Sequence, residues 1–215
     1  MQLFDLSHVI KPDMPQWSGD KQPLKIHRHS EHGPDTHMSS SLEFGCHVGT
    51  HLDGSLHFLE GQPGLHQVPI NQFAGSALVI DASASAVDAS APTIMEADLL
   101  KDHDLSRIDF VLFHTGWDCH WGSEIYYRHW PWLSADLARL LAASNLKGVG
   151  LDTPSLDQMS GSVAHDVCAA AGMVNLENLT GLGPLTDTIV QFMALPLKLY
   201  ETEASPVRAV AWLSE

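Results

Sequence analysis

Short apolar runs and alternating stretches divide this chain into predicted strands. The continuous runs Ala77–Ile80 and Phe110–Phe113 predict buried strands, because strands covered on both faces lose the alternation of half-buried ones. The segment Ser39–Cys46 ends in alternating apolar and polar residues, which predicts a half-buried strand that leads directly to His47. Further strands are expected at Leu3–Ile10, Val149–Leu151, Val174–Leu179 and Val190–Leu195.

Two segments of the second half have the pattern of helices. In Ser134–Ser144 the leucines recur at helical spacing behind a serine that can cap the first turn. Ser162–Ala171 is the second predicted helix, and Gly172 is a suitable residue to end it. The Ala/Ser-rich segment 81–92 is predicted to be a loop rather than a domain linker. Helices alternating with strands predict a mixed α/β fold, with residues 1–215 forming one domain.

Three histidines and an aspartate lie within eleven residues of each other. They are His47, His51, Asp53 and His57, in the run HVGTHLDGSLH. Two imidazoles and a carboxylate can supply three ligands of a divalent metal ion, and the third imidazole is then free to move protons. A histidine-rich surface loop that binds nothing is the alternative, and the position of the run after a predicted strand argues against it.

The spacing of this run requires a bend in the chain. On one strand the four side chains would share a face, but at roughly 3.3 Å per residue His47 and Asp53 would lie about 20 Å apart. No single ion can reach both. Gly49 and Gly54 stand where the chain can turn without a Cβ clash, so we expect a strand followed by a glycine-hinged loop that carries the ligands.

Two other groups of residues are candidates for metal binding. His165 lies in the first turn of the second predicted helix, and Glu177 follows twelve residues later in an otherwise apolar strand. A carboxylate there either faces solvent or needs a buried partner, and the residues alone leave both possibilities open. The pair His27 and His29 has metal-ligand spacing as well, but its polar neighbours favour an exposed strand and loop.

Composition excludes several classes of partner. The 215-residue chain has a net charge of −15, which argues against binding to nucleic acids or anionic membrane surfaces. It contains no apolar stretch of roughly 18 residues that could span a bilayer, and its N-terminus does not resemble a secretory signal. The three cysteines are widely spaced, which favours reduced thiols in the cytoplasm, each expected as a small buried residue.

The signature His47-x-Gly49-Thr50-His51-x-Asp53-x-x-x-His57-Phe58 resembles that of the bacterial metal-dependent cyclase family, which includes kynurenine formamidases and isatin hydrolases. The resemblance extends over nearly the whole chain. It implies a compact α/β fold of the swivelling β/β/α type with a largely antiparallel central β-structure, assembled as a homodimer or larger oligomer. It also implies that His57 is the catalytic acid/base and that the metal ligands are His47, His51, Asp53, His165 and Glu177. The other matching segments are 5–8, 14–20, 150–157, 194–198 and 205–209.

The chemistry of this ligand set agrees with the resemblance. Three imidazoles and two carboxylates without a thiolate suit Zn²⁺ or Mn²⁺, as one ion or a carboxylate-bridged pair per chain. We therefore expect an amide hydrolase that uses a metal-activated water, first of all an arylformamidase for N-formylkynurenine-like substrates. A cyclic-amide hydrolase of the isatin type and a non-catalytic metal- or ligand-binding protein are the alternatives. Trp17 is either an aromatic platform for the substrate or a partly buried core residue.

Overall fold

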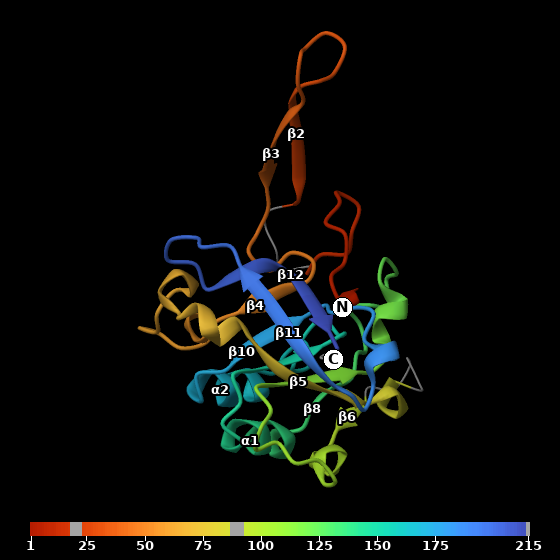
Figure 1. The fold of residues 1–215 in the computed structure, drawn as a ribbon, viewed down its shortest axis with the longest axis vertical. Helices are drawn as coiled ribbons and strands as arrows, with labels where there is room; N and C mark the ends of the chain where they lie inside the picture. Colours follow the sequence, from red (N-terminus) through yellow and green to blue (C-terminus); the bar gives the residue numbers. More distant parts are fainter. Residues whose placement is uncertain (18–22, 87–92, 214–215) are drawn as a thin grey trace.

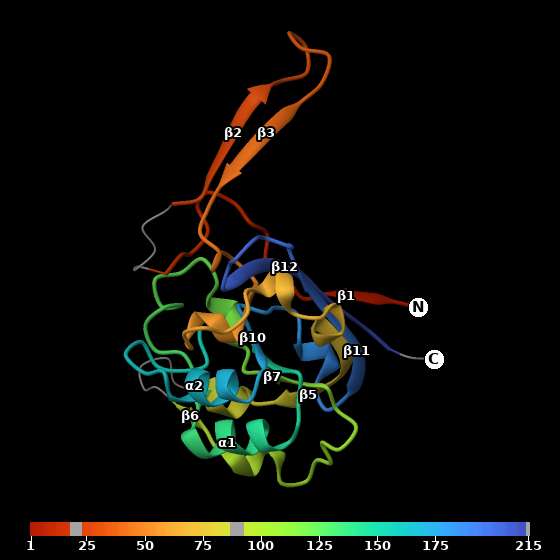
Figure 2. The same ribbon diagram turned by 90° about the vertical axis from the view of Figure 1, so that its left-hand side faces the viewer.

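The structure is a computed structural model that describes residues 1–17, 23–86 and 93–213. Its centre is one mixed sheet in the order β1-β12-β11-β5-β7-β9-β10-β4. The sheet curls so far that β4 pairs with β12 as well as with β10, which closes a ring of strands (Figures 1 and 2). The strands are β1 (Leu3–Asp5), β4 (His51–Asp53), β5 (Ala74–Asp81), β7 (Phe110–His114), β9 (Gly148–Leu151), β10 (Val174–Glu177), β11 (Ile189–Pro196) and β12 (Ala204–Trp212).

The sheet has an apolar core on each face. Along β7, Phe110 and Leu112 belong to the core enclosed by the curled sheet, while Val111 and Phe113 point to the opposite core. The second core lies between the sheet and the helices α1 (Ala135–Ala143) and α2 (Val163–Ala170), which lie side by side below the sheet in Figure 1. Short 3₁₀ turns connect the elements at Ser55–His57, Leu65–Gln67, Ile70–Phe73, Ser83–Ala86, Ala97–Leu100, Trp117–His120 and Gly183–Leu185.

Two smaller sheets complete the described chain. Strands β2 (Lys25–Ser30) and β3 (Ser39–Glu43) form an antiparallel hairpin that projects far from the rest of the molecule in Figures 1 and 2. Strands β6 (Ile94–Met95) and β8 (Trp132–Leu133) form a short parallel pair at the side of α1. The hairpin exposes apolar side chains as well as polar ones, among them Leu42, which is 58% exposed.

Most predicted elements are confirmed, together with the mixed α/β fold class. The Ser134 hydroxyl accepts a hydrogen bond from the Leu137 N–H and caps α1 as expected. The first strand is shorter than predicted and ends at Asp5; beyond it the Leu6 N–H still donates to the Ala209 carbonyl at 2.9 Å, and Ser7 forms an isolated bridge with Leu179. In the segment 81–92, Ser83–Ala86 forms a 3₁₀ turn, and residues 87–92 lie outside the described residues.

Two parts of the strand pattern were predicted wrongly. The strand expected to run from Ser39 into His47 ends at Glu43, and the ligand-bearing strand β4 is a separate element that begins at His51. The nine-residue strand β12 was missed. Its buried positions carry small residues such as Ala209 and Ala211, which give no strong apolar alternation.

Candidate functional site

The signature run folds into a turn, a very short strand and a second turn. Gly49 adopts a φ of +63°, a left-handed conformation that a side chain would strain, and it redirects the chain into β4. In β4, His51 and Asp53 point to the same side, while Leu52 between them is 1% exposed in the enclosed core. Gly54 follows where a Cβ would lie 2.8 Å from the Leu65 side chain. The glycine-hinged loop is therefore found, although its strand starts later than expected.

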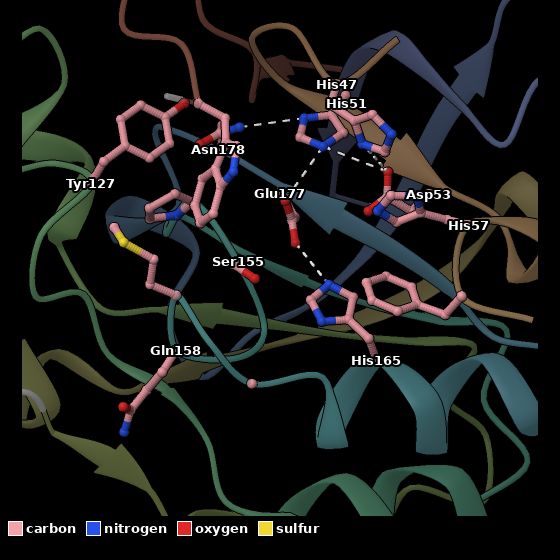
Figure 3. Close-up of a pocket in the computed structure, with 15 residues that line it drawn as sticks. His47, His51, Asp53, His57, Tyr127, Ser155, Gln158, His165, Glu177 and Asn178 are labelled. Atoms are coloured by element: carbon pink, nitrogen blue, oxygen red, sulfur yellow. Dashed lines mark hydrogen bonds and ion pairs between the residues drawn. The ribbon is translucent and has the colours of Figure 1, made fainter. Parts of the chain in front are cut away.

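Strand pairing brings Glu177 to this run. Strand β10 is antiparallel to β4, and Glu177 is the register partner of His51. Figure 3 shows the Glu177 carboxylate between two imidazoles: one oxygen lies 3.4 Å from His51 Nε2 and the other 3.0 Å from His165 Nε2. The first turn of α2 supplies His165. The buried partner that a carboxylate at position 177 requires is thus a pair of histidines.

The remaining two histidines lie on the other side of Asp53. Nδ1 of His47 is 2.9 Å from Asp53 Oδ1, and the His57 ring lies 4.3 Å from the His47 ring, centroid to centroid. Among the described residues, two groups could each hold a metal ion, with ligand atoms within 4.8 Å of one another. Asp53 belongs to both groups. They are His47 with Asp53 and His57, and His51 with Asp53 and Glu177.

Each of the three imidazoles expected as ligands has one ring nitrogen near an outer acceptor and the other near the carboxylates of the site. Nδ1 of His51 lies 2.9 Å from the Gly49 carbonyl oxygen. Nδ1 of His165 lies 2.7 Å from Asp157 Oδ2. Nε2 of His47 lies 3.1 Å from Glu203 Oε1. Metal-binding histidines in proteins have this arrangement, because the outer acceptor fixes the ring and its tautomer.

The buried polar atoms of the site fit a divalent cation. Within the described chain, His51 Nε2 and Asp53 Oδ1 are buried without a hydrogen-bond partner, and a cation between them would satisfy both. Burial alone would lower the pKa of His47, but the nearby carboxylates of Asp53 and Glu203 raise it to about 11. Burial would raise the pKa of Asp53, yet the charges of His51 and His47 hold it well below its usual range. The carboxylates therefore create a negative potential that attracts positive charge.

A cavity of about 240 Å³ opens above these residues. Aromatic rings contribute to its lining: Trp17 packs edge-on against Tyr127 at 5.7 Å, and the Phe58 ring stacks on His165 at 4.3 Å. Trp17 also contacts Trp130 at 5.8 Å, so it both lines the cavity and packs in an aromatic cluster. Trp17 is half-buried, in keeping with the second expectation, and its role as a platform for the substrate stays a prediction. Ser155, Gln158 and Asn178 add polar side chains to the lining, and Asn178 lies beside Tyr127 (Figure 3).

Three residues that the sequence analysis did not single out support the ligands. Besides Asp157 and Glu203, Asn178 donates from Nδ2 to the Gly49 carbonyl at 2.9 Å and accepts from the Tyr126 hydroxyl at 2.8 Å. It is 1% exposed and adopts a φ of +56°, a strained conformation for a residue other than glycine. Asp157, eight residues before His165, was within a segment matched to the family. Nothing in the local pattern pointed to Glu203.

The other candidates of the sequence lie elsewhere. His27 and His29 are on the projecting hairpin, where His29 Nε2 lies 2.8 Å from the Ser41 hydroxyl, in keeping with an exposed polar strand. All three cysteines are free. Cys168 is buried as expected, but Cys119 is exposed and Cys46 is half-buried, so that expectation was wrong for Cys119. Cys119 lies in the 3₁₀ turn Trp117–His120, in which Trp117 is the buried residue.

Comparisons by family model, by sequence and by structure give consistent matches. A family model described as "Putative cyclase" matches residues 4–158. A kynurenine formamidase of Salinibacter ruber is 31% identical over 218 residues, which cover 98% of this chain and 97% of the relative. The structure of isatin hydrolase A from Ralstonia solanacearum superposes with a TM-score of 0.88 at 25% identity, covering 99% of this chain and 92% of that one. A structure described as a predicted metal-dependent hydrolase, from Bacillus stearothermophilus, has a TM-score of 0.79 at 25% identity, with 98% and 97% covered.

Proposed function

This chain belongs to the cyclase family, and from this premise we propose that it hydrolyses aryl formamides such as N-formylkynurenine. Its activity class is that of a metal-dependent hydrolase of carbon–nitrogen bonds other than peptide bonds. One observation carries the proposal: three separate segments bring three imidazoles and two carboxylates together at the wall of a cavity that His57 also lines. A histidine-rich surface loop would not bring two buried carboxylates between its imidazoles.

We assign the ligand roles to His47, His51, Asp53, His165 and Glu177. The ion is Zn²⁺ or Mn²⁺, because the donors are nitrogen and oxygen without sulfur. One or two ions per chain are compatible with five ligands, and Asp53 could bridge a pair because its Oδ1 lies 2.9 Å from His47 Nδ1 and 3.6 Å from His51 Nε2. An ion bound there would provide a water nucleophile at neutral pH and polarise the substrate carbonyl.

His57 is the proposed acid/base. The His57 side chain lines the cavity and is more exposed than the five proposed ligands. Desolvation by its neighbours lowers the pKa of His57, with the charge of His47 adding to the effect and that of Asp53 opposing it. The lowered pKa favours the neutral ring at neutral pH. A neutral imidazole can accept a proton from the attacking water and return it to the nitrogen that leaves the carbonyl.

The cavity walls fit a small aromatic amide. The rings of Trp17, Phe58 and Tyr127 offer apolar faces to an aryl group, and Ser155 and Gln158 offer hydrogen bonds to its polar substituents. An isatin-type cyclic amide is the second candidate, favoured by the likeness to isatin hydrolase A at the level of the whole fold. A non-catalytic metal- or ligand-binding protein on the same scaffold is the third, and it would need no acid/base at position 57.

A substrate screen tests these possibilities. Protein reconstituted with Zn²⁺ or Mn²⁺ would be assayed against N-formylkynurenine, isatin and simple lactones, with the His57→Ala variant as the control. We expect hydrolysis of the aryl formamide with the highest kcat/KM and its loss in the variant. Preference for isatin would establish the cyclic-amide alternative. Absence of turnover on every substrate by the parent protein would overturn the enzymatic proposal and favour a binding protein.

Assembly, domain organisation and location form a further part of the proposal. The projecting hairpin exposes Ile26, Met38 and Leu42, and this supports assembly as a homodimer or larger homo-oligomer. Sedimentation should show a dimer that Leu42→Asp weakens.

Residues 1–215 are proposed to act as one domain, because both apolar cores lie against the same sheet. No described helix is long and apolar enough to cross a membrane. A cytoplasmic location is proposed from the free cysteines.

A further inference from the structure

A carboxylate from a distant part of the chain lies behind His47. Oε1 of Glu203 is 3.1 Å from His47 Nε2, while Nδ1 of the same ring is 2.9 Å from Asp53 Oδ1. Glu203 is 156 positions away from His47 in sequence and lies in the connection between β11 and β12. The imidazole is therefore held between two carboxylates, one on the side of the metal ligands and one on the outer side.

The segment that carries Glu203 is fixed to the signature loop by backbone contacts. The Gly54 N–H donates to the Glu203 carbonyl at 2.8 Å, and the Leu65 N–H donates to the Thr202 carbonyl at 3.0 Å. A third bond joins the Glu201 N–H to His66 Nδ1 at 3.0 Å. These bonds do not involve the Glu203 side chain. The carboxylate is therefore aimed at His47 by a backbone that would stay in place if the side chain were changed.

Of the three imidazoles expected as ligands, His47 has the greatest need of such support. The side chains of His51 and His165 are 3% and 4% exposed, so packing alone restricts their rings. The His47 side chain is 22% exposed. At a partly open position solvent competes for both ring nitrogens, and a half-turn of the ring would move Nδ1 away from Asp53. A charged acceptor at Nε2 opposes that half-turn.

We propose that Glu203 is a positioning residue that holds the His47 ring with Nδ1 directed at the metal centre. The proposal rests on the metal centre of the proposed function, and it concerns the ion bound by His47 in particular. The charges of Glu203 and His57 also interact, but no described hydrogen bond or ion pair joins the two side chains. Its effect on activity would thus follow from the orientation of His47.

Metal affinity provides the first test. Parent protein, Glu203→Gln and the matched control Glu201→Gln would be stripped with a chelator and titrated with Zn²⁺ against a competing chelator at fixed pH. Both variants lose one negative charge from the same loop. Because removing such an outer partner costs about 10- to 100-fold in metal affinity, we expect a loss of that size for Glu203→Gln. The control should stay within about twofold of the parent. Circular dichroism of the stripped proteins would verify that all three are folded.

The orientation of the ring provides the second test. In zinc-loaded protein with ¹⁵N-labelled histidine, long-range ¹H–¹⁵N spectra should show His47 with a protonated Nε2 and a metal-bound Nδ1, and a His47→Gln variant would assign the signals. A purely structural role of Glu203 would not alter this signature, whereas Glu203→Gln should broaden or invert it. A metal-bound Nε2 in the parent, or equal affinities of Glu203→Gln and Glu201→Gln, would overturn the proposal. If the parent itself bound no metal, the proposed function would fail instead.

Discussion

Asp157 offers the clearest test of how the fold prepares the site, because one buried carboxylate serves both α2 and His165. Oδ1 accepts from the Ala164 N–H at 2.9 Å, and Oδ2 accepts from the His165 N–H at 3.0 Å and from His165 Nδ1 at 2.7 Å. Ser162, the residue before the helix, makes no capping bond of its own to the helix backbone. Asp157 thus acts as a helix cap from outside the helix and as the outer partner of a proposed ligand.

The size of the effect follows from these three bonds. Loss of a capping side chain costs about 0.5–2 kcal/mol. Loss of a hydrogen bond to a charged group costs about 1.5–3 kcal/mol. The bonds share one side chain, so their contributions are not strictly additive, and we expect Asp157→Ala to lower the free energy of unfolding by about 3 kcal/mol at neutral pH.

The effect should also depend on pH. Burial alone would raise the pKa of Asp157, but the hydrogen bonds from His165 and from two backbone N–H groups outweigh it, so the pKa is lowered. A carboxyl with a lowered pKa in the folded state stabilises the protein above its unfolded value of about 3.9. This stabilisation is lost as the pH falls through the folded pKa. Parent and Asp157→Ala should therefore differ most at neutral pH and converge in acid.

Urea unfolding of the metal-stripped proteins, followed by circular dichroism, measures this difference. Asp166→Ala is the matched control, because Asp166 is an exposed carboxylate in the first turn of the same helix. It should cost less than about 1 kcal/mol, the usual size of a charge–dipole contribution. If Asp157→Ala and Asp166→Ala proved equally stable at neutral pH, the capping role of Asp157 would be refuted.

Three further predictions concern the metal centre and its chemistry. His51→Ala or Asp53→Ala should lose most of the bound metal in elemental analysis, since a structural zinc site has a binding free energy on the order of 10 kcal/mol; full occupancy in both variants would place the site elsewhere. Burial alone would lower the pKa of His47 and of His165, but neighbouring carboxylates raise the pKa of His47 to about 11 and that of His165 to about 10. In metal-stripped protein each ring is therefore protonated at a pH below its pKa. If binding displaces both protons, affinity should rise about 100-fold per pH unit between about pH 6 and 8 in chelator competition, and a flat profile would contradict this. His57→Ala should keep its metal while kcat falls about 10²–10⁴-fold, and loss of metal would make His57 a ligand instead.

The sequence was sufficient to predict those parts of the site that are close together along the chain. His47, His51, Asp53 and His57 lie within one short run, so their density alone indicated a metal site. The pair His165 and Glu177 carried a much weaker signal, because nothing local shows which strand lies beside β4. The assignment of that pair came from the family resemblance. The structure supplies its physical basis, the antiparallel register of β10 and β4.

The outer partners could not be predicted in the same way. Glu203 is an ordinary acidic residue in an exposed connection, and its contact with His47 depends on the closure of the whole sheet. The strand β4 has a similar dependence on its surroundings. It is only three residues long and is held as a strand by neighbours on both sides, so its sequence contains too few positions for a period to be recognised.

The position of β4 between two strands determines the chemistry of the site. On one side, the register of β10 sets Glu177 opposite His51; on the other, the register of β12 sets Ala204 opposite Asp53, with Glu203 immediately before it. A shift of either strand by one residue would turn these side chains to the opposite face. Glu177 is thus placed by strand pairing, and Glu203 by its position directly before β12, where its carbonyl accepts from the Gly54 N–H. The signature histidines acquire their inner and outer acidic partners only once the ring of strands has closed.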